Sequence, residues 1–244
     1  MQPDVTALIA SLVEAQRRHA GPVDASRYSG LDRETGYSVQ FSVMAALGER
    51  AGMIKTGIHA DGVGVASPIY AGNVGQSGTL KLSGATLAGL EVEIGVVLGK
   101  DIAADAAVDE AAVAAAVDHY LLGIEVCASR FSERKAAGAN GGLADNMSSY
   151  GYVIGPDWPW TGEVNGQDVQ IALDGKEIYA APAKHGFGTV LASVAAYARH
   201  QRPELPLKAG TVITTGSLCG MVPVGGTGHV VASLGGVPVE FDIV

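Results

Sequence analysis

Glycine is the residue that most constrains how this chain can fold, because 34 of its 244 residues, about one in seven, are glycine. Glycine weakens the interior of helices and strands and favours turns, so apolar stretches between glycines can form only short elements. The effect is strongest over residues 53–89, where the glycines are Gly57, Gly62, Gly64, Gly72, Gly75, Gly78, Gly84 and Gly89. This stretch is predicted to be loop-rich and to line a binding site.

The remaining composition is typical of a compact globular protein, with 48% hydrophobic and 17% charged residues. A chain of this length forms one large or two small domains that bury most of their apolar surface. The 16 basic residues against 25 acidic ones give a formal net charge of −9. No basic run accompanies them, so nucleic acid is not an expected partner.

The sequence predicts a cytoplasmic protein that does not enter a membrane. Cys127 and Cys219 lie far apart without paired spacing, which favours reduced thiols. The first twenty residues carry charges and lack an apolar stretch followed by a small-residue cleavage site. No window holds about 18 uninterrupted apolar residues.

Hydrophobic periodicity predicts short helices and strands separated by glycine turns. The predicted helices cover residues 5–19, 34–51, 105–119 and 188–200. The predicted strands cover residues 90–98, 121–128, 150–154, 169–173, 211–215, 229–234 and 237–241, and residues 138–145 form a glycine-rich loop. The order strand, alanine-rich helix, strand over residues 90–128 predicts a crossover unit.

Three glutamates stand in strands that are otherwise apolar. Glu91 and Glu93 are two residues apart, so the alternation of a strand places both carboxylates on one face. Glu125 lies within a second apolar strand. Isolated buried carboxylates are costly and like charges raise each other's pKa, so the three side chains require a compensating cation or basic side chains, and a divalent metal would satisfy all three. Three oxygen donors favour Mg²⁺ or Mn²⁺ over zinc. The alternative is that Glu91 and Glu93 face solvent on an edge strand and Glu125 pairs with Arg130 or a lysine.

Six short motifs in order resemble the 2-keto-4-pentenoate hydratase and 4-oxalocrotonate decarboxylase family, which belongs to the fumarylacetoacetate hydrolase superfamily. The match covers nearly the whole chain. The motifs are Tyr37-Ser38-Val39-Gln40, Ile54-Lys55-Thr56-Gly57, Glu91-Val92-Glu93-Ile94, Gly123-Ile124-Glu125-Val126-Cys127-Ala128-Ser129-Arg130, Asp145-Asn146-Met147-Ser148-Ser149 and Thr215-Gly216-Ser217.

The resemblance implies an α+β fold of the fumarylacetoacetate-hydrolase-like type, a mixed β-roll or barrel with flanking helices. Residues 1–80 are then expected to form a helical and loop-rich region and residues 81–244 a metal-binding β-roll core, both within one continuous unit. It also implies a Mg²⁺ or Mn²⁺ site at Glu91, Glu93 and Glu125, and a homo-oligomer. Lys55 matches the acid/base lysine of the family, and partial desolvation is expected to lower its pKa.

Several further residues are candidates for binding and catalysis. Ser148 lies in a motif whose short side chains and amide donors would orient a carboxylate or a water molecule, although its polar residues equally suit a capped turn. Thr215 and Ser217 would bind a substrate carboxylate, or simply end a strand. The family often has an acidic residue after a proline, where this chain has Ile69. His59 and Asp145 are therefore the candidates for activating water.

These residues predict a metal-dependent lyase that binds a small 2-oxo or 2-hydroxy acid. The expected reaction is hydration of a 2-hydroxy-2,4-dienoate to a 4-hydroxy-2-oxo acid, with Lys55 moving the proton. The alternatives are a 4-oxalocrotonate-type decarboxylase, an acylpyruvate C–C hydrolase and, less favoured, a non-catalytic binding protein. The sequence leaves the distal half of the substrate undefined.

Overall fold

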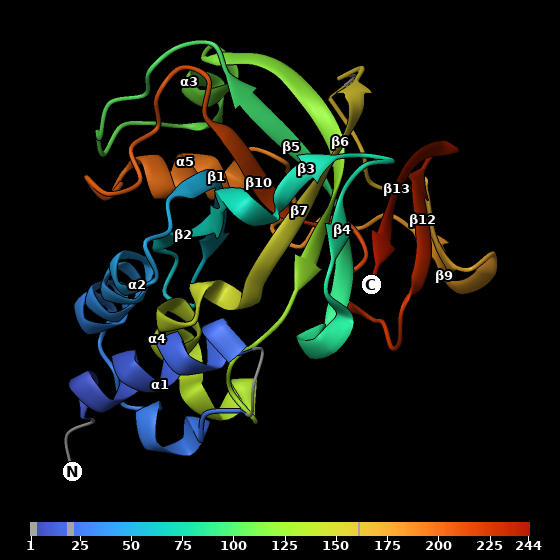
Figure 1. Cartoon of the computed structure of the whole chain (residues 1–244). Coiled ribbons are helices and arrows are strands. Elements are labelled where there is room, and N and C mark those ends of the chain that lie inside the picture. The colour runs from blue at the N-terminus through green and yellow to red at the C-terminus, as the bar shows by residue number, and fades with distance from the viewer. Residues whose placement is uncertain (1–3, 19–21, 161) are drawn as a thin grey trace.

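The computed structural model describes residues 4–18, 22–160 and 162–244. It shows a curled sheet with the N-terminal helices gathered at one end and a second, smaller sheet at the side (Figure 1). This mixed α+β arrangement confirms the predicted fold class.

The described residues form two helices of 14 and 15 residues and three helices of five to seven residues. They are α1 (Val5–Arg18), α2 (Arg33–Leu47), α3 (Glu110–Ala114), α4 (Gly138–Ala144) and α5 (Ala192–Ala198), with 3-10 turns η1 (Ala25–Tyr28), η2 (Ala71–Asn73), η3 (Gly84–Thr86), η4 (Arg134–Ala137) and η5 (Asn146–Ser148). The strands are β1 (Ala51–Ile58), β2 (Gly64–Tyr70), β3 (Val74–Gln76), β4 (Lys81–Leu82), β5 (Gly89–Leu98), β6 (Val117–Cys127), β7 (Ser149–Trp158), β8 (Asp168–Leu173), β9 (Lys176–Pro182), β10 (Val212–Ser217), β11 (Val222–Pro223), β12 (Gly228–Leu234) and β13 (Val237–Ile243).

The larger sheet has the strand order β2-β1-β10-β5-β6-β7-β3, with β11 paired to β5, and the smaller has the order β4-β13-β12-β8-β9. The parallel pairs β1–β10 and β3–β7 bring together segments far apart in the sequence. Strands from both the 1–80 and the 81–244 regions therefore share one sheet. Within the described residues, no helix is long and apolar enough to cross a membrane.

Strict alternation along β5 and β6 separates the main core from a second, partly polar face. Val92, Ile94 and Ile124 belong to the main hydrophobic core, which also takes Val230 and Phe241 from the smaller sheet. The intervening residues of β5 and β6 point to the opposite face, because successive side chains of a strand alternate. That face carries the three glutamates.

A separate layer of helices packs beside the larger sheet. Leu8 and Leu12 of α1 and Val39 and Val43 of α2 form one apolar cluster with the region around α4. At Gly36 a Cβ atom would lie 2.8 Å from the backbone oxygen of Asn140, so only glycine lets α2 approach α4 this closely.

The predicted crossover between residues 90 and 128 is wrong, because β5 and β6 pair antiparallel. The alanine-rich stretch is helical only in α3, which begins after Asp109, whose side chain accepts a hydrogen bond from the amide of Ala112. Strand β6 already begins at Val117, which pairs with Leu98. Pairing with the neighbouring strand therefore overrides the helix propensity of the alanines, because tertiary contacts outweigh intrinsic propensity.

Other predicted boundaries also change. Residues 138–144 form helix α4 rather than a loop, and the predicted helix over 188–200 shortens to α5. The predicted helix over 34–51 ends at Leu47, because Gly48 adopts the left-handed conformation that caps helices, and β1 follows. The predicted first helix matches α1, except that residue 19 lies outside the described residues.

Candidate active site

A cavity of about 500 Å³ opens on the face of the sheet that carries the glutamates. It lies between β1, β5, the η4–α4 segment and two glycine-containing segments near residues 186 and 216. Among the predicted site residues, those that line it are Lys55, His59, Glu91, Glu93 and Ser217.

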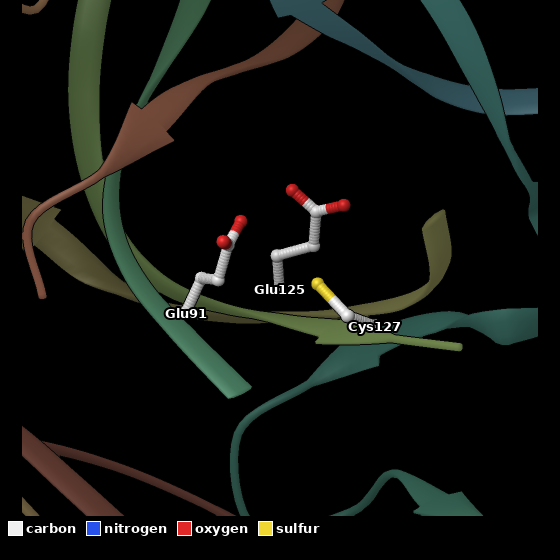
Figure 2. Close-up of side chains that lie close together, drawn as sticks. All are labelled: Glu91, Glu125 and Cys127. Atoms are coloured by element: carbon white, nitrogen blue, oxygen red, sulfur yellow. The ribbon is translucent and has the colours of Figure 1, made fainter. Parts of the chain in front are cut away.

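Lys55 and the glutamates form the floor of this cavity. The Lys55 Nζ atom donates a hydrogen bond to Glu125 Oε1 at 2.7 Å and lies 3.8 Å from Glu91 Oε2. Glu91 and Glu125 are direct partners across β5 and β6, and their carboxylates rise from the same face (Figure 2). Glu91 and Glu93 therefore do not face solvent. Glu125 does pair with a lysine, as the sequence alternative holds, but it does so inside the site.

Two carboxylate oxygens at this floor are buried without a hydrogen-bond partner in the described structure, Glu93 Oε1 and Glu125 Oε2. Their companion atoms are bonded: Glu93 Oε2 accepts from the Gly216 amide at 3.3 Å, and Glu125 Oε1 also accepts from Ser149 Oγ at 2.7 Å. Burial, followed by the charge of Glu125, raises the pKa of Glu93 well above its usual value. Burial also raises the pKa of Glu125, although Lys55 opposes this change. These carboxylates offer oxygen ligands for a divalent cation, although the group whose ligand atoms all lie within 4.8 Å of one another contains Glu91 and Glu125 but not Glu93.

The expected lowering of the Lys55 pKa assumes a neighbouring metal ion as well as partial desolvation, and the protein side chains by themselves act in the opposite direction. Burial alone would lower this pKa, but Glu125 and Glu91 outweigh burial and raise the pKa above the usual lysine value. The ammonium group is therefore charged in this structure and acts as a counter-ion to the glutamates.

A strained turn completes the surroundings of Lys55. Asn146, Met147 and Ser148 all adopt positive φ angles, at 50°, 51° and 62°, a conformation that non-glycine residues rarely take. This turn brings the Met147 backbone oxygen to 3.5 Å from Lys55 Nζ. It also leads directly into Ser149, the residue that bonds Glu125.

Cys127 is a residue of the site that the sequence interpretation did not assign. One ligand atom each of Glu91, Glu125 and Cys127 lie within 4.8 Å of one another, and Figure 2 shows the thiol on the same side of β6 as Glu125. The signal was present in the sequence, because residues 125 and 127 of one strand must share a face.

Asp145 is buried outside the cavity lining and is fully engaged with its neighbours. Its carboxylate accepts hydrogen bonds from the side chain and amide of Arg130 and, at 2.8 Å, from Ser129 Oγ. Burial raises the pKa of Asp145 and the Arg130 guanidinium opposes that change. This geometry makes Asp145 the counter-ion of Arg130 rather than a group that can reach bound water.

Of the three residues expected to bind substrate, only Ser217 lines the cavity. The Thr215 hydroxyl is buried and donates to the backbone oxygen of Ile94 at 2.6 Å. Ser148 is buried, and its hydroxyl oxygen has no partner in the described structure.

His59 and Ile69 lie in different environments. His59 is half-buried at the cavity, and burial followed by the charge of Arg33 lowers its pKa, so its imidazole is neutral at pH 7. Ile69 is buried in an apolar cluster with Met53, Leu121 and Tyr152. An acidic residue at position 69 would lie in this apolar cluster and not in the cavity lining.

The cavity wall and rim include residues without a clear sequence signal. Phe187 lines the wall, and its position is tied to His185, whose Nδ1 atom accepts a hydrogen bond from the Phe187 amide at 3.2 Å. Arg134 and Lys135 of η4 also line the cavity. Their place depends on how η4 packs, which local sequence does not reveal.

Comparison of the structure with solved structures shows where this fold occurs. The 4-oxalocrotonate decarboxylase of Pseudomonas putida G7, solved with magnesium and adipate, is 20% identical, with a TM-score of 0.81 over 98% of this chain and 97% of that chain. The 2-hydroxyhepta-2,4-diene-1,7-dioate isomerase of Mycobacterium marinum is 16% identical, with a TM-score of 0.56 over 80% of this chain and 75% of that chain. The fumarylpyruvate hydrolase of Pseudomonas aeruginosa, solved with Mn²⁺ and pyruvate, is 16% identical, with a TM-score of 0.51 over 74% of this chain and 78% of that chain.

The sequence comparisons agree with the fold. No curated protein matches the chain at a significant level. The family model described as the C-terminal region of fumarylacetoacetate hydrolase matches residues 66–239, which is more than half of the chain and includes the three glutamates. The chain therefore belongs to the fumarylacetoacetate hydrolase family.

Proposed function

We propose that this protein is a divalent-metal-dependent lyase acting on a 2-hydroxy-2,4-dienoate or its 2-oxo tautomer, with Mg²⁺ or Mn²⁺ held by Glu91, Glu93 and Glu125. The observation that carries the proposal is the pair of buried carboxylate oxygens without hydrogen-bond donors, Glu93 Oε1 and Glu125 Oε2. A buried anionic oxygen without a partner is costly, and a hard cation satisfies two of them at once.

A cation bound there supplies the positive charge that stabilises an enolate developing from a 2-oxo acid. Lys55 is placed to carry the proton between the enol oxygen and carbon. Glu125 Oε1 and the Met147 oxygen fix the position of its ammonium group. Ser217 lines the cavity, and its hydroxyl, which donates to the Gly220 backbone oxygen at 3.1 Å, would have to rotate to donate to the substrate carboxylate.

Water addition is the first candidate reaction. His59 is neutral at pH 7 and lines the cavity, so its imidazole can accept a proton from water while the hydroxyl oxygen adds to the conjugated carbon. The product is a 4-hydroxy-2-oxo acid. The apolar side chains of Val65, Met147 and Phe187 limit the remaining water around the substrate.

Decarboxylation is the second candidate, favoured by the likeness to 4-oxalocrotonate decarboxylase over nearly the full length of both chains. Loss of CO₂ from 4-oxalocrotonate leaves an enolate. An enolate of the same kind forms when the 2-hydroxy-2,4-dienoate ketonises. Lys55 and the glutamates therefore suit both reactions, and only the product distinguishes them.

The test is to follow the ultraviolet absorbance of 2-hydroxypenta-2,4-dienoate and of 4-oxalocrotonate with the protein and Mg²⁺, and to identify the products. Formation of 4-hydroxy-2-oxopentanoate supports hydration, and release of CO₂ from 4-oxalocrotonate without hydration supports the second candidate. Turnover of neither substrate, or turnover unaffected by chelation of the metal, would contradict the proposal.

A further inference from the structure

Arg134 and Lys135 form a basic rim at the mouth of the cavity. Both lie in η4, both line the cavity, and both side chains are exposed. Neither side chain forms an ion pair or hydrogen bond with another described residue, and the neighbouring Glu133 is likewise exposed and pairs with neither. The chain has a net charge of −9, so two adjacent basic side chains without acidic partners make this part of the surface locally positive on a protein that is negative as a whole.

The cavity changes character from its floor to this rim. At the floor, Lys55 is paired with Glu125 and Glu91, so its positive charge is already compensated. The walls between floor and rim include the apolar side chains of Ile58, Val65, Met147 and Phe187. The rim is the part of the cavity where basic side chains stand without compensation. A ligand that fits this profile has a metal-binding head, a short apolar middle and an anionic far end.

We propose that Arg134 and Lys135 bind a second carboxylate at the far end of the substrate, so that the site takes 2-oxo dicarboxylates in preference to 2-oxo monocarboxylates. This inference rests on the proposed function, which places the 2-oxo acid head at the glutamates. An arginine guanidinium can donate two parallel hydrogen bonds to a carboxylate, and the lysine ammonium adds a point charge and further donors. The rim thereby defines the half of the substrate that the sequence left open.

The test uses two unreactive probes that differ only at the far end. 2-Oxoadipate and 2-oxohexanoate have the same length and the same 2-oxo acid head, but only the first has a distal carboxylate. Their binding to the full-length protein in the presence of Mg²⁺ is measured by titration calorimetry. Because charge-assisted hydrogen bonds are among the stronger ones, we expect wild-type protein to bind 2-oxoadipate at least about tenfold more tightly.

The variant Arg134→Gln/Lys135→Gln should lose this preference while its affinity for 2-oxohexanoate stays unchanged, which also shows that the fold and the head site are intact. The matched control is Lys100→Gln/Lys176→Gln, which removes the same charge from exposed positions outside the cavity lining. This control should keep the preference.

The outcomes separate the two hypotheses. Equal binding of both probes to wild-type protein, or a preference that survives in the Arg134→Gln/Lys135→Gln variant, overturns the rim assignment and leaves the proposed function standing. An equal loss of preference in the control variant shows a general effect of net charge and also overturns it. Failure of both probes to bind wild-type protein with Mg²⁺ overturns the proposed function, and the rim assignment with it.

Discussion

The buried ion pair between Arg130 and Asp145 allows a direct test of whether Asp145 acts in the chemistry or in the fold. The side chains of Arg130 and Asp145 are 8% and 1% exposed. Replacing Asp145 by Asn removes the charge and leaves the guanidinium buried without a counter-ion. Breaking a buried pair in this way costs about 3–5 kcal/mol.

The structure places the expected cost at the lower end of that range. The Arg130 guanidinium also donates to the backbone oxygens of Ala128 and Ser149, at 3.0 and 3.1 Å, and to the Asp145 backbone oxygen, and these bonds survive the substitution. We therefore expect Asp145→Asn to lower the free energy of unfolding by about 3 kcal/mol. For a chain of this size the melting temperature should fall by about 6–12 °C.

Urea denaturation followed by circular dichroism measures this change, with Asp61→Asn as the matched control. Asp61 also pairs with an arginine, Arg33, but its side chain is 56% exposed, so its loss should change the free energy of unfolding far less than the loss of Asp145. Turnover is measured at a temperature where both variants are folded. If Asp145→Asn is as stable as Asp61→Asn yet has lost about a hundredfold or more in turnover, Asp145 is a catalytic group and the structural interpretation fails.

Three further outcomes are expected. Lys55→Ala should lower turnover by about 10²- to 10⁴-fold. Mn²⁺ binding should be kept or strengthened, because the substitution removes a cation that competes for the glutamates. Retention of more than about a third of the rate would assign the proton transfer to another residue. Glu93→Gln should weaken Mn²⁺ binding in calorimetry by about tenfold or more, and unchanged affinity would remove Glu93 from the proposed ligands. Burial lowers the pKa of His185 to about 4, so the unfolded chain takes up this proton first as pH falls. The free energy of unfolding should therefore drop between about pH 6.5 and pH 4, by at most about 3 kcal/mol, and an identical pH dependence in His185→Asn would refute this cause.

The parts of the site that the sequence predicted are those governed by strand alternation. Because side chains alternate along a strand, Glu91 and Glu93 must point to the same face of β5. This holds for any neighbouring strand with which β5 pairs. The same rule applied to β6 would have placed Cys127 beside Glu125. The meeting of Lys55 with Glu125 is different, because it depends on β1 pairing with β10 and β10 with β5. Only the family resemblance pointed to Lys55, since no local pattern encodes such distant pairing.

The sequence interpretation failed where tertiary packing overrides local preference. Alanine favours a helix over residues 105–119, but the hydrogen bonds of β6 with β5 determine the conformation from Val117 onward. The glycines of residues 138–145 suggest a loop, yet residues 138–144 form α4, which packs closely against α2 at Gly36. Asp145 has the residue type of a catalytic base, and only the buried position of Arg130 beside it reveals a structural partner.

The charges at the cavity floor explain why Lys55 and the three glutamates occur together. Three ionised carboxylates and one ammonium group leave a formal charge of −2, which one divalent cation balances. Without that cation the protein must leave carboxyl groups protonated, which agrees with the raised pKa of Glu93 and of Glu125. Lys55 alone cannot satisfy the site, because its nitrogen reaches Glu125 Oε1 while Glu93 Oε1 and Glu125 Oε2 stay without donors. The lysine thus compensates part of the buried charge and leaves a remainder that matches a divalent ion in both charge and ligand type.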